Sequence, residues 1–219
     1  MRTFIRRFVY LVVFIGFSSS IAGSYEDFFI AIKQNDDRAV ESLLKRGFDP
    51  NTRDPNGFHG LFLAVKEPSP KAAMVLIEWP KTNVETRTAQ DESPVMIASL
   101  NGDLELVRRL VKRGAHVNKP GWTALHYAAT SGHLAVIRFL LDESAYIDAE
   151  APSGATPLMM AAHYGTPQAV KLLLDEGADP LLKDRRGLNA IDFANRANQT
   201  DSAELIAAHI RNRQPRGKW

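Results

Sequence analysis

The chain has 219 residues, of which 45% are apolar and 24% charged, so it has the length and composition of a globular protein with a sizeable core. Cysteine is absent, which excludes disulfide frameworks, thiolate zinc sites, iron–sulfur ligation and cysteine catalysis. Formal net charge is +2, divided into +3 on residues 1–22 and −1 on the remainder, so the main part of the chain lacks the strong positive charge of a polyanion-binding protein.

The N-terminal segment, 1–22, has the order of a secretory signal peptide. Three arginines precede an apolar run over residues 8–17, and Ser20 and Ala22 supply the small residues of a cleavage site. Ten apolar residues form a helix of about 15 Å, half the roughly 30 Å of a hydrocarbon core. We therefore expect export to the periplasm, with cleavage after Ala22 and no stable membrane span afterwards. The alternative is an uncleaved N-terminal anchor that leaves the chain facing the periplasm.

From residue 25 onward the sequence repeats. Segments 91–98, 121–128 and 154–161 align position by position, and weaker copies begin at residues 57 and 187. The period is about 33 residues, a length typical of solenoids built from one repeated unit. The alanine of each copy marks the phase of the repeat, and it recurs at Ala31, Ala64, Ala98, Ala128, Ala161 and Ala194.

The sequence of each unit predicts two helices joined by a tight turn. Ser93-Pro94 and Thr156-Pro157 offer a hydroxyl that can cap the first helix, then a proline where no backbone donor is needed. The second helix carries its leucines and valines on one face, which indicates burial against neighbouring units. Glycines predict the left-handed ends of both helices. Those expected after the first helix are Gly102, Gly132 and Gly165, and those after the second are Gly47, Gly114 and Gly177.

Two units depart from this pattern. In the second unit, residues 67–70 replace the glycine turn with Glu-Pro-Ser-Pro, and Trp79-Pro80 replaces the glycine that ends the second helix. A stiffer corner is expected there, because proline fixes the backbone. The interval from Ala98 to Ala128 is shorter than the others, because residues are missing within 116–121. This deletion predicts a shorter third projecting loop.

The pattern resembles the ankyrin-repeat family, whose Gly-x-Thr-Pro-Leu-His-x-Ala-Ala, Gly-His, Leu-Leu and Gly-Ala-Asp elements are matched best by residues 121–184. The resemblance implies an all-α ankyrin-repeat solenoid of about six helix-turn-helix units with projecting β-turn loops. It also implies structural hydrogen bonds for His126, near Thr123, and for His133, in the turn between helices. The expected repeat domain covers residues 23–210, followed by a basic flexible tail over 211–219. The units fall approximately at 25–54, 55–87, 88–119, 120–150, 151–184 and 185–210.

Motifs that carry chemistry are absent from the sequence. It contains no phosphate-binding glycine loop, no His-Glu-x-x-His zinc motif, no calcium loop and no Gly-x-Ser-x-Gly elbow. We therefore expect no catalytic residue, no metal ion and no cofactor, and interpret the chain as non-enzymatic. The four cations of the tail have no aromatic residues interleaved with them, so nucleic acid is not the expected partner.

Binding in this family usually uses the concave groove and the loop tips, so the candidate residues are those that the repeat pattern leaves free. For Trp122 and Tyr164, a binding hot spot and ordinary packing are both open. His163 is interpreted as a binding contact or a plain surface residue. The candidate partner-binding residues are Phe58, Glu92 and Trp122 on the loops, and Lys66, Glu67, Asn101, Thr130, Ser131, His163 and Tyr164 in the groove.

These observations predict a protein that binds a folded protein partner in the cell envelope and is a monomer when unbound. The resemblance implies, most concretely, an inhibitor or immunity-type protein for an envelope enzyme. The alternative is a scaffold or chaperone-like factor for periplasmic protein assembly or stress tolerance. A tight one-to-one complex that abolishes an enzyme's activity would favour the first, and several weak clients the second.

Overall fold

The computed structural model describes residues 23–67 and 69–213. The predicted signal peptide and its cleavage site lie outside these residues, as do residues 214–219 of the predicted tail. The chain divides into two compact units, one that ends at Asn83 and one that begins at Val84. The single repeat domain expected over residues 23–210 is therefore described as two units, each by itself.

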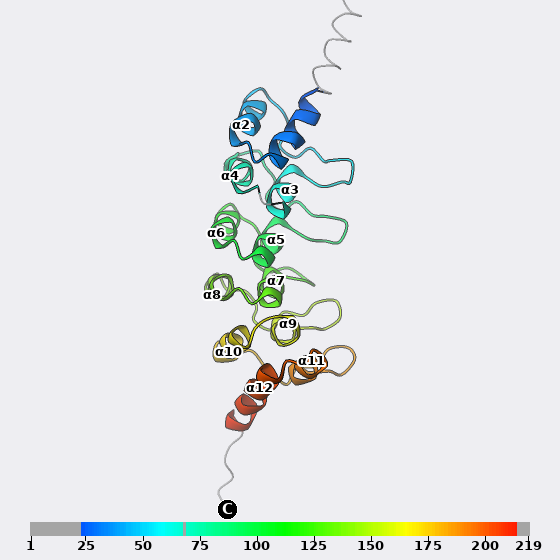
Figure 1. Ribbon diagram of the computed structural model, residues 1–219, viewed down its shortest axis with the longest axis vertical. Coiled ribbons are helices and arrows are strands. Elements are labelled where there is room, and N and C mark those ends of the chain that lie inside the picture. The colour runs from blue at the N-terminus through cyan, green and yellow to red at the C-terminus, as the bar shows by residue number, and fades with distance from the viewer. Residues whose placement is uncertain (1–22, 68, 214–219) are drawn as a thin grey trace, which may run out of the picture. The chain divides into compact units, whose positions relative to one another are not determined.

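The described part of the first unit holds two helix pairs. The first pair is a helix over residues 23–33 followed by α2 (Asp37–Lys45), and the second is α3 (Gly60–Lys66) followed by α4 (Pro70–Glu78) (Figure 1). α2 packs on α4. The helix over 23–33 approaches α3 so closely that a Cβ at Gly60 would lie 2.6 Å from the Phe28 ring and 2.9 Å from the Ile32 side chain. Glycine at this position lets the two helices touch.

The helices described in the second unit alternate between two rows. The first helices of successive repeats pack side by side in one row, and the second helices form the other (Figure 1). The first row contains α5 (Pro94–Asn101), α7 (Ala124–Ser131), α9 (Pro157–Tyr164) and α11 (Ala190–Arg196). The second row contains α6 (Leu104–Lys112), α8 (Leu134–Asp142), α10 (Pro167–Asp175) and α12 (Thr200–Arg213).

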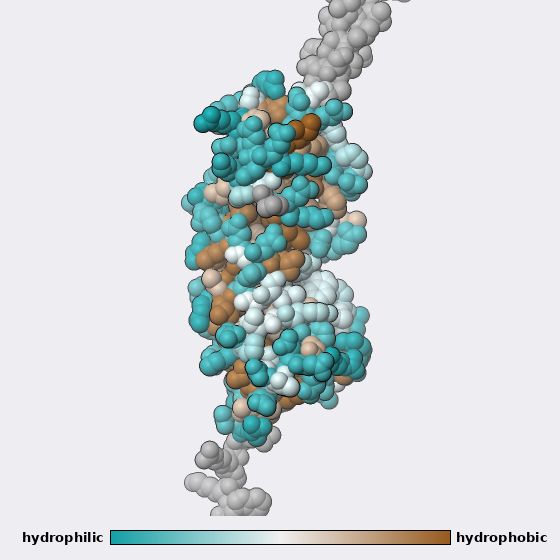
Figure 2. All heavy atoms as spheres, in the orientation of Figure 1, coloured by the Kyte–Doolittle hydropathy of each residue, from teal (hydrophilic) through white to brown (hydrophobic). Residues whose placement is uncertain are grey.

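The repeated alanine marks the same place in every first helix. All six of these alanines are at most 4% exposed. A methyl group suits this position because neighbouring first helices leave little space between them. The described residues form helices, turns and one isolated β-bridge between Arg53 and His59, so the predicted all-α repeat fold is confirmed. Figure 2 shows hydrophilic residues over most of the visible face, with apolar residues exposed in small patches.

Most of the predicted helix ends are confirmed. Pro94 and Pro157 begin α5 and α9, and the Thr156 hydroxyl accepts a hydrogen bond from the Met159 amide. The cap predicted for Ser93 is wrong, because its side chain makes no capping hydrogen bond and is buried instead. Left-handed glycines follow both helices of a pair, with positive φ at Gly47, Gly102, Gly114, Gly132 and Gly177.

Gly165 is a correction to the predicted turn geometry. Its φ is −85°, so it does not end α9 in the left-handed conformation. A Cβ at this position would lie 2.5 Å from the Ala129 carbonyl oxygen and 2.9 Å from the Ala161 Cα. The position needs glycine because the backbone of two first helices meets there. With a ψ of −144° at Gly165, the chain passes directly into Thr166, which caps α10.

Two places differ from the regular repeat, as the sequence predicted: the corner between α3 and α4, and the third projecting loop. α3 ends without glycine, and Glu67 takes an extended conformation there. In the second unit of the structure, paired backbone hydrogen bonds close the loops 88–92, 151–155 and 184–188, but no such pair closes the described loop 116–122. The deletion therefore removes the tip of that loop, as predicted.

The C-terminal boundary differs from the expectation. α12 continues to Arg213, so residues 211–213, expected in the flexible tail, are the last residues of a helix. The regular backbone hydrogen bonds of α12 extend it by about two turns past Ile206, its last buried residue. Within the described part of the chain, no helix is long and apolar enough to cross a membrane.

Candidate functional site

In four of the projecting loops, one side chain at the base of the loop ties it to the next repeat. Asn118 shows the full arrangement: its amide donates to the Ser144 carbonyl at 2.8 Å, and its oxygen accepts from the Tyr146 backbone N–H at 2.8 Å. Asn51 makes the same pair of bonds with the Lys81 carbonyl and the Asn83 N–H. Equivalent single-residue ties are made by Glu85 to the His116 N–H and by Asp148 to the Asp179 N–H.

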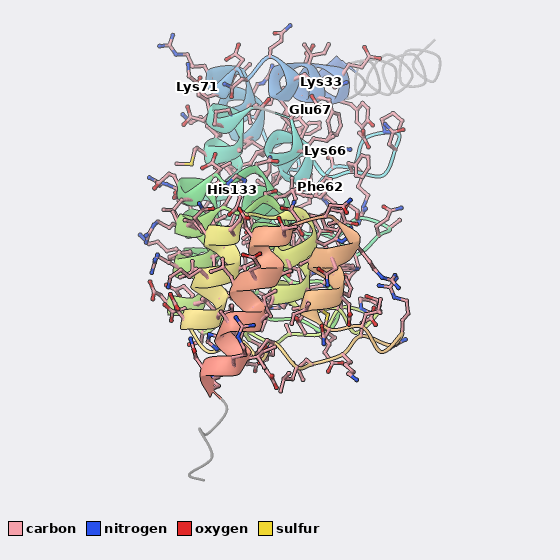
Figure 3. The ribbon with its side chains drawn as sticks, turned by 60° about the horizontal axis from the view of Figure 1, so that its bottom comes forward. Lys33, Phe62, Lys66, Glu67, Lys71 and His133 are labelled. Carbon is pink, nitrogen blue, oxygen red and sulfur yellow. The ribbon has the colours of Figure 1, made fainter. Side chains whose placement is uncertain are left out.

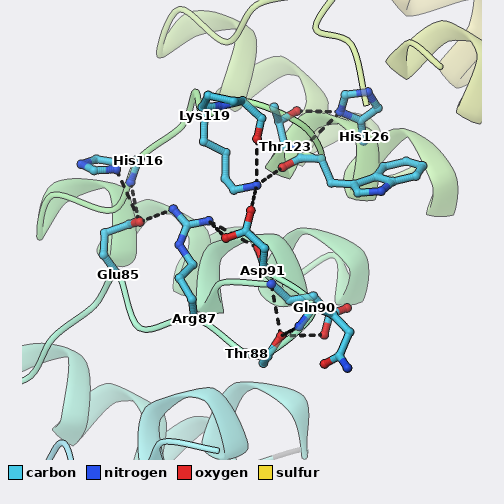
Figure 4. A network of polar contacts seen from close by, with 12 residues as sticks. Glu85, Arg87, Thr88, Gln90, Asp91, His116, Lys119, Thr123 and His126 are labelled. Atoms are coloured by element: carbon cyan, nitrogen blue, oxygen red, sulfur yellow. Dashed lines mark hydrogen bonds and ion pairs between the residues drawn. The ribbon is translucent and has the colours of Figure 1, made fainter. Parts of the chain in front are cut away.

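Lys119 organises the shortened loop (Figure 4). Its ammonium lies 2.6 Å from the Asp91 carboxylate and donates to the carbonyl oxygens of Pro120 and Trp122 at 3.1 and 2.9 Å. The Lys119 side chain is only 10% exposed. The hydrogen bond from Lys119 and its charge, with a further contribution from Arg87, lower the pKa of Asp91 below its ordinary value. A cation thus holds a loop that has lost its hairpin hydrogen bonds.

The neighbouring loop carries the other half of this network. Arg87 lies 2.5 Å from Glu85 and 3.7 Å from Asp91, and the second oxygen of Glu85 accepts the His116 backbone N–H at 2.6 Å. The sequence pattern did not identify Lys119 as the residue that holds this loop. Its position within the shortened interval, directly before Pro120, could have indicated that role.

His126 and His133 make the structural hydrogen bonds that the resemblance implied. His126 is fully buried, and its Nε2 lies 3.0 Å from the Ala155 carbonyl oxygen, which can only accept, so Nε2 carries the proton. Its Nδ1 accepts from the Thr123 N–H at 3.2 Å. Burial lowers the pKa of His126 to about 4. His133 donates in the same way to the Leu100 carbonyl at 3.0 Å.

Trp122 and Glu92 are engaged with neighbouring side chains. The Trp122 ring is half-buried and packs edge-on against His126 at 5.2 Å and Tyr127 at 6.5 Å between ring centres. The Tyr127 hydroxyl donates to Glu92 at 3.1 Å, and burial together with the Glu92 charge raises the pKa of Tyr127. Trp122 thus packs on the first helix of its own repeat.

The candidates in the first unit form a small cluster. Phe58 stacks on Phe62 with 5.3 Å between ring centres, and the Lys66 ammonium lies 4.8 Å from the centre of the Phe58 ring. Glu67 is half-buried and directly follows α3. Figure 3 shows Lys66 and Glu67 at the end of α3, with Lys33 at the end of the preceding first helix. The loop residue Phe58 and the groove residue Lys66 are thus brought together.

In the second unit, the groove candidates differ in what they already bind. The Thr130 hydroxyl donates to the His126 carbonyl one turn earlier at 2.8 Å, so it serves its own helix. Asn101 is exposed and Ser131 half-buried at the ends of α5 and α7. Asn101 and Ser131 thus place polar side chains at the ends of α5 and α7.

His163 does not occupy the free position that the sequence indicated. Its Nδ1 lies 3.0 Å from the Phe193 carbonyl oxygen in the next repeat, so it donates a hydrogen bond that ties α9 to α11. Tyr164 packs edge-on against His163 at 4.2 Å between ring centres, yet 60% of the residue is exposed. Tyr164 is therefore the large groove aromatic with most of its surface available to a partner.

Many polar groups of the loops bind one another and the backbone, an arrangement that stabilises the loops. Among the described residues, no group of three or more His, Cys, Asp or Glu side chains is placed to hold a metal ion. The stacked helices form a rigid support from which side chains can reach a partner.

Known proteins with related sequence or structure share the repeat. The family description "Ankyrin repeats (3 copies)" matches residues 28–119 and 61–151, and "Ankyrin repeats (many copies)" matches residues 144–194. The mouse ankyrin repeat and SAM domain-containing protein 6 is 34% identical over 58% of this chain, which spans 14% of that relative's length. The putative ankyrin repeat protein YahD of Escherichia coli is 28% identical over 86% of this chain and 98% of its own.

A solved structure extends this likeness to the fold. A chain in the complex of a predatory endopeptidase from Bdellovibrio bacteriovorus with an immunity protein aligns with a TM-score of 0.72 and 26% identity, over 83% of this chain and 97% of that one. Ankyrin repeats are protein-binding modules, which agrees with a surface of mutually supported loops. With its phased alanines, paired helices and matching repeats over residues 28–194, this chain belongs to the ankyrin-repeat family.

Proposed function

We propose that the chain is an exported protein-binding module that acts as an inhibitor or immunity-type protein for an enzyme of the cell envelope. The observation that carries this proposal is the likeness to a chain from an endopeptidase–immunity protein complex, which extends over 97% of that chain. The arginine-rich, then apolar, N-terminal sequence supports export.

The binding surface of the second unit is centred on Tyr164. Trp122, Glu92, Thr130 and His163 already contact their own or the next repeat, whereas Tyr164 has most of its surface exposed. Exposed tyrosines on rigid supports often become binding hot spots, because a large ring is buried at little cost in conformational entropy. We assign Tyr164 as an anchor for the partner enzyme.

The test uses the chain from Gly23 onward as bait in an extract of the source cell's envelope. One dominant protein is expected by mass spectrometry, and the purified protein should lose its enzymatic activity at a one-to-one ratio of added chain. Tyr164→Ala should raise the dissociation constant about 30-fold, the effect of a hot spot of about 2 kcal/mol. Tyr146→Ala is the matched control, since Tyr146 is 69% exposed in a loop of the same unit.

The outcomes separate the alternatives. Several weakly held proteins without loss of any activity would instead support the scaffold or chaperone-like function. Equal dissociation constants for the wild type and Tyr164→Ala would reject the site while leaving inhibition intact. Export is tested by intact mass: a periplasmic species that begins at Gly23 is expected, and a full-length cytosolic species would contradict the proposal.

A further inference from the structure

Aromatic rings and arginines occur together on α9, on α11 and in the loop before α11. We call five of these residues the arginine–aromatic patch: His163, Tyr164, Arg186, Phe193 and Arg196. The rings form a continuous series, with 4.2 Å between the centres of Tyr164 and His163 and 6.0 Å between those of His163 and Phe193. The Arg186 guanidinium lies 5.5 Å from the centre of the Phe193 ring. A cation over a ring at this distance is attracted by its π-electrons.

Arg186 is held in place by a buried carboxylate. Its Nε and Nη2 both lie 2.8 Å from one oxygen of Asp184, whose side chain is fully buried. The other oxygen of Asp184 accepts the backbone N–H groups of Arg186 and Leu188 at 2.8 and 3.0 Å. Asp184 is thus saturated by groups of its own loop, while the Arg186 side chain remains 60% exposed. Two of the five guanidinium N–H groups are used, and three remain for a ligand.

Arg196, in the last turn of α11, is the second arginine of the patch. It follows Phe193 by three positions in α11, which places both residues on one face of the helix. Arg196 is exposed and has no ion-pair partner among the described residues. The nearby Asp192 carboxylate caps α11 by accepting the Asn189 N–H at 2.9 Å. Arg196 also interacts favourably with the C-terminal end of the α11 dipole, a contribution that leaves its side chain open to solvent.

The exposed guanidinium groups of the patch stand out from the charge of the whole unit. Residues 84–213 carry 14 basic and 16 acidic side chains, so the unit as a whole is slightly negative. An exposed arginine that is held over an aromatic ring, as Arg186 is, complements a ligand with planar anionic groups. Carboxylates fit this requirement, because a guanidinium donates two parallel hydrogen bonds to one carboxylate.

We infer that the arginine–aromatic patch is the docking site for an acidic peptide segment of the partner protein. Arg186 and Arg196 bind carboxylates of this segment, and Tyr164 packs against its neighbouring side chain. Arg186 needs no reorganisation because Asp184 and Phe193 already hold it, which lowers the entropic cost of binding. This inference rests on the proposed function for the existence of a protein partner, and it specifies the chemistry that the partner presents.

The test uses a random library of 12-residue peptides displayed on phage, selected against the chain from Gly23 onward. Selected peptides should be enriched in Asp and Glu, and a synthetic peptide with the consensus sequence should bind more weakly as salt concentration rises. Arg196→Glu should weaken its binding at least about tenfold. Arg138→Glu, an exposed arginine of α8 with no partner among the described residues, makes the same charge change and should alter binding less than about twofold.

A second variant separates geometry from charge. Arg186→Lys keeps the positive charge but loses the planar guanidinium, so the peptide should bind several-fold more weakly. The urea midpoint of the variant is measured in parallel to verify that it folds. Absence of selected peptides, absence of acidic enrichment, or equal losses in Arg196→Glu and Arg138→Glu would overturn the inference. Acidic peptides that bind the patch in a chain that inhibits no envelope enzyme would instead leave this site in place and reject the proposed function.

Discussion

The buried imidazole of His126 should make the stability of the protein depend on pH in a way that one substitution removes. His126→Met is the chosen change, because Met96 and Met159 occupy the equivalent position in neighbouring repeats and are each 1% exposed. At pH 7.5 the variant should be less stable by about 1–3 kcal/mol, since the buried Ala155 carbonyl loses its hydrogen-bond donor.

The pH dependence follows from the difference between two pKa values. His126 has a pKa of about 4 in the folded protein, lowered by burial, and its ordinary value of 6.5 applies to the unfolded chain. The unfolded state therefore takes up a proton first as the pH falls, and the folded wild type loses stability below about pH 6.5. The linkage relation gives a loss of about 2 kcal/mol at pH 5 and about 3 kcal/mol at pH 4, relative to pH 7.5.

Urea unfolding at pH 7.5, 6 and 5, followed by far-UV circular dichroism, measures this effect. The stability gap between the wild type and His126→Met should shrink by about 2 kcal/mol from pH 7.5 to pH 5, because the variant has no group to titrate there. Met96→Ala is the control: it destabilises a buried site but keeps His126, so its gap to the wild type should not change with pH. If the stability difference between the wild type and His126→Met does not change with pH, the assignment of a neutral, buried imidazole is refuted.

Three further substitutions test how the loops and turns are held. Lys119→Met should lower the free energy of unfolding by about 2 kcal/mol in urea titrations, because it removes the hydrogen bonds to Asp91 and two loop carbonyls. Gly165→Ala should cost about 2 kcal/mol, measured in the same way, since the added methyl would clash with backbone atoms at 2.5–2.9 Å. Burial, together with the charge of Asp179, raises the pKa of Asp148, so Asp148→Asn should increase the free energy of unfolding at pH 7, as asparagine serves at two equivalent positions. This gain should disappear as the pH falls through the raised pKa of Asp148, because the carboxyl is then neutral in the wild type as well.

The repeat itself could be predicted from the sequence because its signals are local. A capping residue, a proline, a small residue facing the next helix and a left-handed glycine act within one or two helical turns, so their spacing specifies each helix pair. Thr156-Pro157 and Gly132 were interpreted correctly on this basis. The roles of His126 and His133 came from the family resemblance, and the hydrogen bonds of the structure agree with them.

Only the tertiary structure decided which side chains contact another part of the chain and which remain exposed to a partner. Gly165 is required by the approach of two helices that are far apart in sequence, so local turn rules gave the wrong reason for it. His163 reaches the Phe193 carbonyl of the next repeat, and Lys119 reaches back to Asp91 in the preceding loop. Arg186 lies over Phe193 of its own repeat, a contact that the sequence pattern did not indicate. Contacts between repeats depend on distances across the stack, which a one-dimensional pattern does not contain, and these contacts leave Tyr164 and the arginines exposed.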